Sequence, residues 1–347
     1  MPRLASFARA AFPAKTRRRR TVRAHRHDRI RADTEIFAGG AVLPLSRLQL
    51  AMIELTNLCN LRCIMCGIWE ELPNRIFPLD RFAEIVGTRP VRNARAIALT
   101  GGEPFMIGNL ADYYDLLIAR SPRSHVNLST NGWYTERTLE LLEHADRKRT
   151  SVTISYDGLR SHDAIRRTEG SRERLLETAR LVRARFPEVA LSLKMTITNE
   201  NHGEILDTAK ECRDLGIPFR MKTLEKLVCH QGRYPSPVTG PEYDDPIVAS
   251  ITEQARRVLE LGIDTNRGYI RSLIDKNGGA DEPCSCSPRT LFVGIDGKVF
   301  LCRRRAPIGE LSSNDLGGIW ASPAKRDAVR AMRECRSDRL SLGFRHA

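Results

Sequence analysis

The sequence predicts an α/β fold: a partial (β/α)6 barrel of the TIM type followed by a small C-terminal domain. Beyond residue 48, short apolar segments of strand length alternate with stretches that carry apolar residues at three-to-four spacing. Strands that alternate with helices form parallel sheets with right-handed crossovers. Near Gly278 the alternation gives way to turn-rich sequence. These observations predict a basic, disordered extension (1–47), the barrel (48–225), a connecting helical segment (226–277) and the small domain (278–347).

Six strands and five helices follow from these patterns. The expected strands are Gln49–Leu55, Ala94–Leu99, His125–Ser129, Ser151–Ser155, Ala190–Ile197 and Phe219–Thr223. The expected helices are Asp80–Val86, Leu110–Ala119, Glu136–Glu143, Arg172–Arg185 and His202–Leu215. Asp80 is expected to cap the first helix, because its carboxylate can accept hydrogen bonds from free backbone N–H groups. A hairpin around Asp296-Gly297 and a last helix in 322–335 are expected in the small domain.

Composition and cysteine content indicate in which cellular compartment the protein is expected. The chain has 347 residues, of which 41% are hydrophobic, so a sizeable core is possible. No apolar run reaches the roughly 18 residues of a membrane span, and the N-terminus lacks the apolar segment of a signal peptide. We therefore expect a cytoplasmic protein, whose thiols stay reduced. In that setting nine cysteines indicate metal or redox chemistry rather than disulfides.

The positive charge is concentrated near the N-terminus. In residues 1–32, ten Arg, one Lys and one Asp give a net charge of +10, and the other 315 residues carry only about +4. Such a charge block is typically a disordered, solvated leader. Binding of this arm to nucleic acid, an acidic partner or a membrane surface is the alternative. A salt-sensitive shift of transfer RNA, abolished by deleting residues 1–32, would favour RNA binding.

Three cysteines lie within the stretch CNLRCIMC, directly after the first expected strand. Cys59, Cys63 and Cys66 have the spacing C-x-x-x-C-x-x-C, and the next histidine is His125. Thiolates favour iron–sulfur clusters, zinc and Cu(I), but a structural zinc site needs four ligands. Three thiolates on a cluster of four irons leave one iron open to another molecule. Because the loop follows a barrel strand, it is expected at the carboxyl-end mouth, where such barrels carry their chemistry.

This loop resembles the signature of radical S-adenosylmethionine (radical SAM) enzymes. The resemblance implies that Cys59, Cys63 and Cys66 bind a [4Fe–4S] cluster whose fourth iron chelates the amino and carboxylate groups of SAM. One electron then cleaves SAM to methionine and a 5′-deoxyadenosyl radical, which abstracts a hydrogen atom from the substrate. The family usually has an aromatic residue before the last cysteine. Met65 stands there instead and can fill the same apolar slot.

Further motifs of the family follow the later strands in order. GGEP resembles the segment that holds the SAM amino group, and STNG and SYDG resemble segments that approach SAM. AIRR has an arginine at a place where related enzymes often have one near the SAM carboxylate. Each short segment by itself is also typical of an ordinary turn. The resemblance covers residues 48–225. Its candidate SAM-binding residues are Gly101, Gly102, Glu103, Ser129, Asn131, Ser155, Asp157 and Arg166.

Four cysteines occupy the C-terminal segment. The spacing from Cys286 through Gly297 to Cys302 resembles the SPASM and Twitch extensions of radical SAM enzymes. A full SPASM domain would need more cysteines, so the resemblance implies a Twitch-like domain with one auxiliary [4Fe–4S] cluster. If Cys284 is not a ligand, that cluster has an open iron. A zinc site is the alternative for four thiolates. The expected ligands are Cys284, Cys286, Cys302 and Cys335.

Two more cysteines and an arginine run complete the candidates. Cys212 lies in a helical stretch and is expected to be a small core residue. Cys229 follows the sixth strand near the expected mouth, where its thiol could return a hydrogen atom to a substrate radical; a buried or incidental thiol is the alternative. The run Arg303 to Arg305 could offset cluster charge or bind an anionic substrate group, with a solvated turn as the alternative.

The expected function is cleavage of SAM followed by oxidation or epimerisation of a substrate. The resemblance allows a natural-product sugar or aminocyclitol, or a ribosomal peptide. About 48 residues precede the first strand and their composition does not suggest a folded leader-binding module. An external electron donor such as flavodoxin or ferredoxin is implied. An RNA-modifying protein and a non-catalytic iron–sulfur sensor are the alternatives, and the sensor would produce no 5′-deoxyadenosine.

Replacing Cys63 by Ala removes one of the three expected cluster ligands. We expect the reconstituted protein to lose this cluster and all formation of 5′-deoxyadenosine from SAM. Iron analysis and chromatography of the reduced reaction measure the two effects. Cys212→Ala is the matched control, because that thiol is expected in the core. Equal losses in both variants would contradict the assignment.

Overall fold

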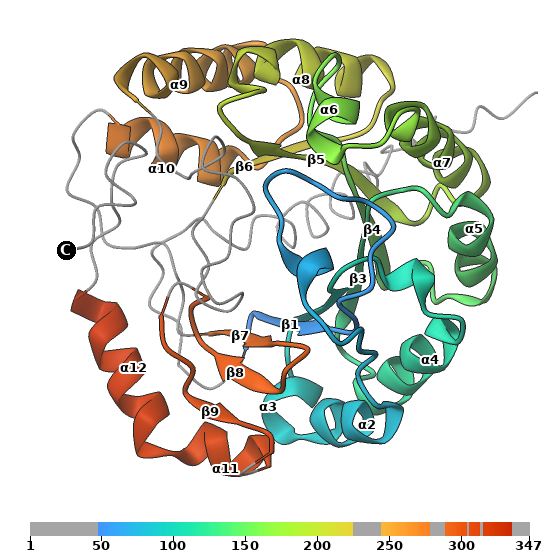
Figure 1. The fold of residues 1–347 in the computed structure, drawn as a ribbon, viewed down its shortest axis with the longest axis vertical. Coiled ribbons are helices and arrows are strands. Elements are labelled where there is room, and N and C mark those ends of the chain that lie inside the picture. The colour runs from blue at the N-terminus through green and yellow to red at the C-terminus, as the bar shows by residue number, and fades with distance from the viewer. Residues whose placement is uncertain (1–47, 225–243, 278–288, 304, 313–314, 335–347) are drawn as a thin grey trace, which may run out of the picture.

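The chain forms an open barrel of strands with helices around its outside (Figure 1). The computed structural model describes residues 48–224, 244–277, 289–303, 305–312 and 315–334. One sheet contains nine strands in the order β6-β5-β4-β3-β2-β1-β7-β8-β9. Strands β1 to β7 run parallel, and β8 and β9 continue the sheet antiparallel. Among the described strands, the sheet ends at β6 and β9 without closing, which confirms the predicted partial barrel.

The six predicted barrel strands are present, with ends that differ from the prediction by at most two residues. Each alternates with helices, as the apolar spacing predicts. The strands are β1 Leu50–Glu54, β2 Ala96–Thr100, β3 His125–Thr130, β4 Thr150–Ser155, β5 Ala190–Ile197, β6 Phe219–Thr223, β7 Thr290–Val293, β8 Lys298–Phe300 and β9 Gly309–Glu310.

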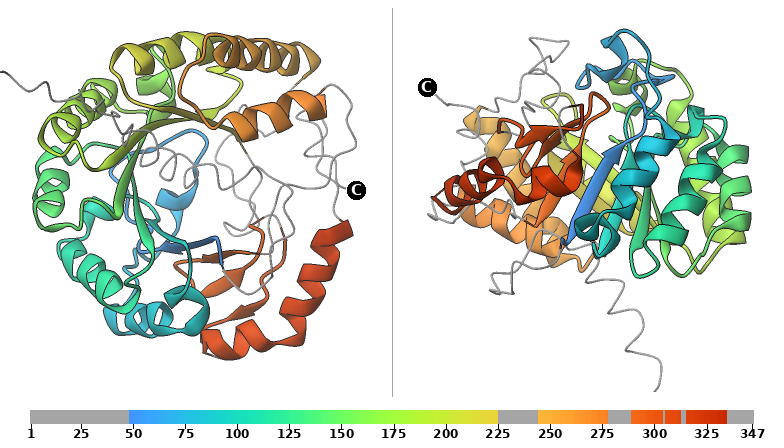
Figure 2. Two further views of the ribbon diagram at one scale, coloured as in Figure 1. Left: turned by 180° about the vertical axis from the view of Figure 1, so that it is seen from behind. Right: turned by 90° about the horizontal axis from the view of Figure 1, so that it is seen from below.

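The α-helices lie outside the sheet (Figure 2). Helices α2 to α10 come between its parallel strands in the chain, and α11 and α12 follow β9. The α-helices are α2 Leu79–Gly87, α3 Arg89–Arg92, α4 Leu110–Arg120, α5 Thr135–His144, α6 His162–Arg166, α7 Ser171–Arg185, α8 Ile205–Asp214, α9 Asp245–Glu260, α10 Arg267–Asn277, α11 Leu316–Ala321 and α12 Pro323–Glu334. The short 3-10 helices are η1 Ile68–Glu70, η2 Pro104–Met106 and η3 His202–Glu204.

The predicted cap of the first helix is wrong. Helix α2 begins at Leu79, one residue before Asp80, and Pro78 occupies the N-cap without a side-chain hydrogen bond. Asp80 therefore lies inside the first turn, and its Oδ1 accepts a hydrogen bond from the backbone N–H of Arg81 at 2.8 Å. The apolar spacing located this helix, but it did not fix the first residue.

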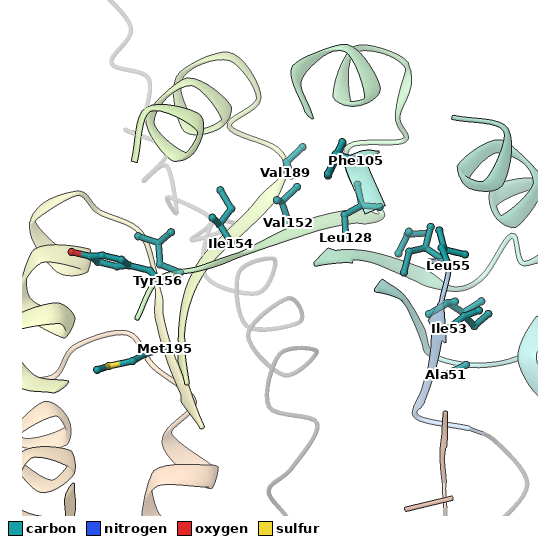
Figure 3. Close-up of a cluster of buried hydrophobic side chains, with 14 of the residues drawn as sticks. Ala51, Ile53, Leu55, Phe105, Leu128, Val152, Ile154, Tyr156, Val189 and Met195 are labelled. Atoms are coloured by element: carbon teal, nitrogen blue, oxygen red, sulfur yellow. The ribbon is translucent and has the colours of Figure 1, made fainter. Parts of the chain in front are cut away.

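The strands divide their side chains between two faces. On the outer face, residues such as Ile53, Leu128 and Ile154 are fully buried against the helices (Figure 3). On the inner face, β3, β5 and β6 present partly exposed side chains between buried neighbours. The main apolar core therefore lies between sheet and helices. A small separate apolar group covers part of the inner face and consists of Leu50, Met52, Ala96 and Ala98.

The C-terminal hairpin extends the barrel sheet. Strand β7 pairs with β1 in parallel, from Leu50 beside Thr290 to Ile53 beside Val293. The predicted turn at Asp296-Gly297 is confirmed, and Gly297 has the positive φ of 82° that suits glycine. The last helix, α12, lies inside the predicted range 322–335. The proposed boundary at residue 278 thus falls between segments that share one sheet.

Two further expectations concern burial and apolar length. Cys212 is fully buried in α8, which confirms its predicted place in the core. Within the part of the chain that the structure describes, no helix combines the length and the apolar character that a membrane span requires.

Leu128→Ala should destabilise the fold through a cavity between β3 and the helices. Leu128 is fully buried, and such truncations cost about 2–5 kcal/mol. The free energy of unfolding, measured by urea titration, should fall by that amount. The matched control is Leu72→Ala at a side chain that is 79% exposed, where a change within about 0.5 kcal/mol is expected. Similar losses in both variants would contradict this view of the core.

Candidate active site

The cysteine loop leaves β1 at the carboxyl ends of the parallel strands, as the sequence predicts. Cys63 is buried, and Cys59 and Cys66 are half-buried. Met65 packs into the main core beside them, so it fills an apolar slot. The thiols therefore lie at the mouth of the barrel, between the core and the space above the strands.

Two polar side chains before the first cysteine fold the loop back on itself. Thr56 Oγ1 donates a hydrogen bond to the carbonyl of Arg75 at 2.7 Å. Asn57 Oδ1 accepts from the Arg75 N–H at 2.6 Å, and its Nδ2 donates to the carbonyls of Glu71 at 2.9 Å and Pro73 at 3.1 Å. Both side chains are buried, so these bonds fix the two ends of the cysteine loop together.

The GGE segment holds the cysteine loop through its backbone. The N–H of Gly102 donates to the carbonyl of Thr56 at 2.6 Å, and the N–H of Glu103 donates to the carbonyl of Leu58 at 2.7 Å. A Cβ at Gly101 would lie 2.3 Å from the Thr56 oxygen, and a Cβ at Gly102 would lie 2.0 Å from the Leu58 oxygen. Only glycines permit this approach, so the motif sets the position of Cys59.

The carboxylate of Glu103 is fully buried and organises the end of β3. It accepts hydrogen bonds from Thr130 Oγ1 at 2.7 Å, the Asn131 N–H at 2.7 Å and the Phe105 N–H at 3.1 Å. Burial raises the pKa of Glu103 to about 7, and these donors act against that rise. Its side chain therefore works as a positioning group. Contact of this motif with the SAM amino group stays a prediction.

The STNG and SYDG segments lie at the same end of the sheet. Asn131 Nδ2 donates to Asn60 Oδ1 in the cysteine loop at 2.9 Å, so Asn131 supports the loop. Ser129 lies on the inner face of β3, where its Oγ donates to Asn127 Oδ1 at 3.1 Å. Ser155 lies on the inner face of β4, partly exposed. Both serines thus face the side from which a bound molecule would approach.

Arg166 and Asp157 form a buried ion pair that reaches the cysteine loop. Arg166 Nη2 lies 2.5 Å from Asp157 Oδ2, and Arg166 Nη1 lies 3.5 Å from Cys63 Sγ. Asp157 Oδ1 accepts from the Thr196 N–H at 2.8 Å, which ties the pair to β5. The nearby Asp157 and Cys63 raise the pKa of Arg166 despite its burial, so the guanidinium stays charged. A fixed positive charge therefore lies beside the thiols.

The residues present fit an iron–sulfur cluster with a bound anion. Burial raises the pKa of Cys59 to about 11 and that of Cys66 to about 12, so binding of iron would displace thiol protons. In the described part, no three His, Cys, Asp or Glu side chains converge on one metal ion, and a cluster holds its thiolates farther apart than one zinc does. Arg166 Nε is buried without a hydrogen-bond partner there, which leaves a donor for a bound carboxylate.

The second cysteine group is described only at Cys302. Phe300, the last residue of β8, pairs with Phe292 of β7, and Phe292 pairs with Met52 of β1. Strand β8 therefore ends level with the middle of β1. Because β8 runs antiparallel, the chain is then heading away from the mouth, and half-buried Cys302 follows. Cys229, Cys284, Cys286 and Cys335 lie outside the described residues. Their predicted roles stay predictions.

Several residues that build the site were missed in the sequence. Asn57 and Thr130 contact only backbone or neighbouring side chains, and His162 Nδ1 accepts from the Asp157 N–H at 3.0 Å. The bonds from Asn57 to Glu71 and from Thr130 to Glu103 join residues 14 and 27 positions apart, and no local motif marks them. Lys194 was missed too, although a lysine amid the apolar residues of β5 was a visible signal of an inward-facing charge.

A thiol loop at the mouth of an open parallel barrel fits an iron–sulfur protein that binds a second molecule beside its cluster. Residues 53–212 match the radical SAM superfamily, and residues 284–340 match the iron–sulfur cluster-binding domain SPASM. The chain therefore contains a radical SAM domain and, after it, a SPASM-type domain. These domains imply [4Fe–4S] clusters and SAM as cofactors. The second match begins at Cys284.

Characterised relatives align with about half of the chain or less. The sporulation killing factor maturation protein SkfB of Bacillus subtilis is 31% identical over 182 residues, which are 50% of this chain and 41% of SkfB. A GTP 3′,8-cyclase of Desulforamulus reducens is 31% identical over 111 residues, 31% of this chain and 34% of that protein. The subtilosin biosynthesis protein AlbA of Bacillus subtilis is 29% identical over 171 residues, 48% and 37%. The aligned part is thus less than half of each.

Solved structures share the fold over most of the chain. SuiB of Streptococcus suis bound to S-adenosylmethionine has a TM-score of 0.61 at 14% identity, with 82% of this chain and 68% of SuiB covered. The protein anSMEcpe with bound AdoMet has a TM-score of 0.62 at 14% identity, with 82% and 84% covered. At this identity the likeness establishes the fold alone.

Gly102→Ala should displace the cysteine loop, because the added Cβ would lie 2.0 Å from the Leu58 carbonyl oxygen. We expect a loss of about 3 kcal/mol in the free energy of unfolding, the upper range for overpacking. Iron content after reconstitution should fall as well. Gly108→Ala is the control, since its Cβ would meet nothing within 4 Å. Full iron content in Gly102→Ala would refute the positioning role of this glycine.

Proposed function

We propose that this chain is a radical SAM enzyme that modifies a C–H bond of a ribosomally made peptide. The observation that carries the proposal is the thiol loop of Cys59, Cys63 and Cys66, clamped to GGE and flanked by the buried Arg166. The peptide is supported by relatives named for maturation of a killing factor and for biosynthesis of a bacteriocin, and by a SuiB structure with precursor peptide SuiA. A small molecule is the second candidate, because other relatives are GTP 3′,8-cyclases.

Each residue of the site has a proposed task. The three thiolates would hold three irons of the cluster, and Arg166 Nε would donate to the SAM carboxylate. Ser129 and Ser155 would hydrogen-bond SAM from the inner face. When bound and reduced by one electron, cluster and SAM supply a 5′-deoxyadenosyl radical that takes a hydrogen atom from the substrate. A flavodoxin or ferredoxin would donate the electron, in the reducing cytoplasm.

The fate of the substrate radical would depend on the remaining cysteines. Electron transfer to an auxiliary cluster held by Cys284, Cys286, Cys302 and Cys335 would give an oxidised product. Hydrogen return from Cys229 would give an epimer. Cys229→Ala separates the two outcomes, since an oxidised product would form at an unchanged yield and an epimer would not form. Mass and stereochemical analysis of the product measure this difference.

The proposed reaction is tested with the reconstituted full chain under anaerobic reduction. Formation of 5′-deoxyadenosine from SAM is expected, and Cys63→Ala should form none. A precursor peptide encoded beside the gene, deuterated at its side chains, should transfer deuterium into 5′-deoxyadenosine. Transfer only from a small molecule would support the second candidate. No 5′-deoxyadenosine under any condition would contradict radical chemistry.

A further inference from the structure

Two lysines lie together on the inner face of β5 and β6. The pairing sets Lys194 beside Arg220 and Thr196 beside Lys222, so Lys194 and Lys222 point to the same side of the sheet. Both are partly exposed, whereas Met195 and Met221 next to them are buried under the helices. The two ammonium groups therefore face the inside of the barrel.

Arg303 brings a third positive charge from the C-terminal hairpin. Its guanidinium carbon lies 5.2 Å from the ring centroid of Phe292. Phe292 on β7 pairs with Met52 of β1, which belongs to the small apolar group on the inner face. Arg303 also acts electrostatically on Lys194. The arginine thus faces the same space, from the opposite side of the barrel.

Among the residues that the structure describes, no carboxylate pairs with Lys194. Within the described residues Lys194 makes no ion pair, and the carboxylate that attracts it electrostatically is that of Asp157. Asp157 is already bound to Arg166 at 2.5 Å and to the Thr196 N–H at 2.8 Å. Burial, Lys222, Arg303 and Arg166 lower the pKa of Lys194 to about 7, against the attraction of Asp157. A bound anion would relieve this repulsion.

Neutral hydrogen-bonding groups line the neighbouring strands. Asn127 Nδ2 donates to Ser151 Oγ at 2.9 Å and to Thr153 Oγ1 at 3.0 Å, and Thr153 Oγ1 lies 3.4 Å from Ser192 Oγ. The register places Ser192 beside Thr153 and Lys194 beside Ser155. A polar strip therefore leads from β3 to the lysines. If the inside of the barrel served only as an apolar core, it would need neither this polar strip nor the two lysines.

We propose that Lys194, Lys222 and Arg303 bind an anionic group, a carboxylate or a phosphate, of the substrate. This rests on the proposed function, because it places that group between Arg166 at the SAM site and the hairpin that leads to Cys302. Charge-assisted hydrogen bonds to ammonium and guanidinium groups fit either anion. The carboxylate of SAM is the other possible source of the anion, and Arg166 with its unpartnered Nε is the better donor for it.

Calorimetry of the anaerobic, SAM-saturated holoenzyme tests the site. Glutarate and sulfate serve as probes, because neither titrates near pH 8. Binding of both is expected, and Lys194→Met should weaken it about tenfold or more, as expected for one lost charge-assisted bond. Lys194→Arg should keep the affinity. The matched control is Lys210→Met on α8, with a side chain that is 41% exposed, and no change is expected there.

Proton uptake adds a readout that a merely structural lysine would not give. Titrations at pH 8 in two buffers of different ionisation enthalpy count the protons bound with the anion. The wild type should take up protons, because the anion stabilises the charged form of Lys194. Lys194→Arg should bind the probe without uptake, because arginine stays protonated at this pH.

Three results would overturn the proposal. The first is that neither probe binds to the SAM-saturated enzyme. The second is that Lys194→Met weakens binding of SAM as much as binding of glutarate, which assigns the lysines to SAM. The third is that Lys210→Met has the same effect as Lys194→Met. If any of these results is found and 5′-deoxyadenosine still forms, the anion site is contradicted and the proposed function stands. If the probes bind as expected but no 5′-deoxyadenosine forms, the anion site stands and the proposed function is contradicted.

Discussion

Two backbone hydrogen bonds, from Gly102 to Thr56 and from Glu103 to Leu58, position the rest of the site. They join the ends of two neighbouring parallel strands, β1 and β2, at the mouth of the barrel. The bonds form only because no Cβ stands between the two chains. Glu103 then extends the same clamp to Asn131, which supports the cysteine loop through Asn60. The three thiols lie on a loop, and this clamp ties the loop to rigid strands.

The separation of the two sheet faces lets the fold be stable and carry a polar interior. Burial against the helices on the outer face provides the apolar stabilisation, so the inner face is free to hold serines, threonines and lysines. Charges on that side remain costly unless they are matched. Arg166 is matched by Asp157, whereas Lys194 has no ion pair in the part of the chain that the structure describes. This contrast separates Arg166, whose charge the protein matches, from Lys194, where we propose that a substrate anion binds.

Most of the fold could be predicted because its signals are local. Period and length located all six barrel strands, and β5 and β6 agree with the prediction at both ends. The failure at Asp80 is also local, since apolar spacing does not specify which residue starts a helix. The pairing of β7 with β1 was not predictable in this way. It joins residues some 240 positions apart, and no periodicity within either strand records its partner.

The sequence by itself determined the chemistry of the loop: three thiols at a fixed spacing, with family motifs after the second, third and fourth strands. It also placed Arg166 and Asp157 among the candidates. The tertiary structure alone decided that these two form an ion pair, that Glu103 is a buried positioning group, and that Lys194 shares a face with Lys222. The physical reason is that spacing along the chain fixes residue type and local geometry. Burial and charge neighbours, which set what a side chain can do, arise only when distant strands come into register.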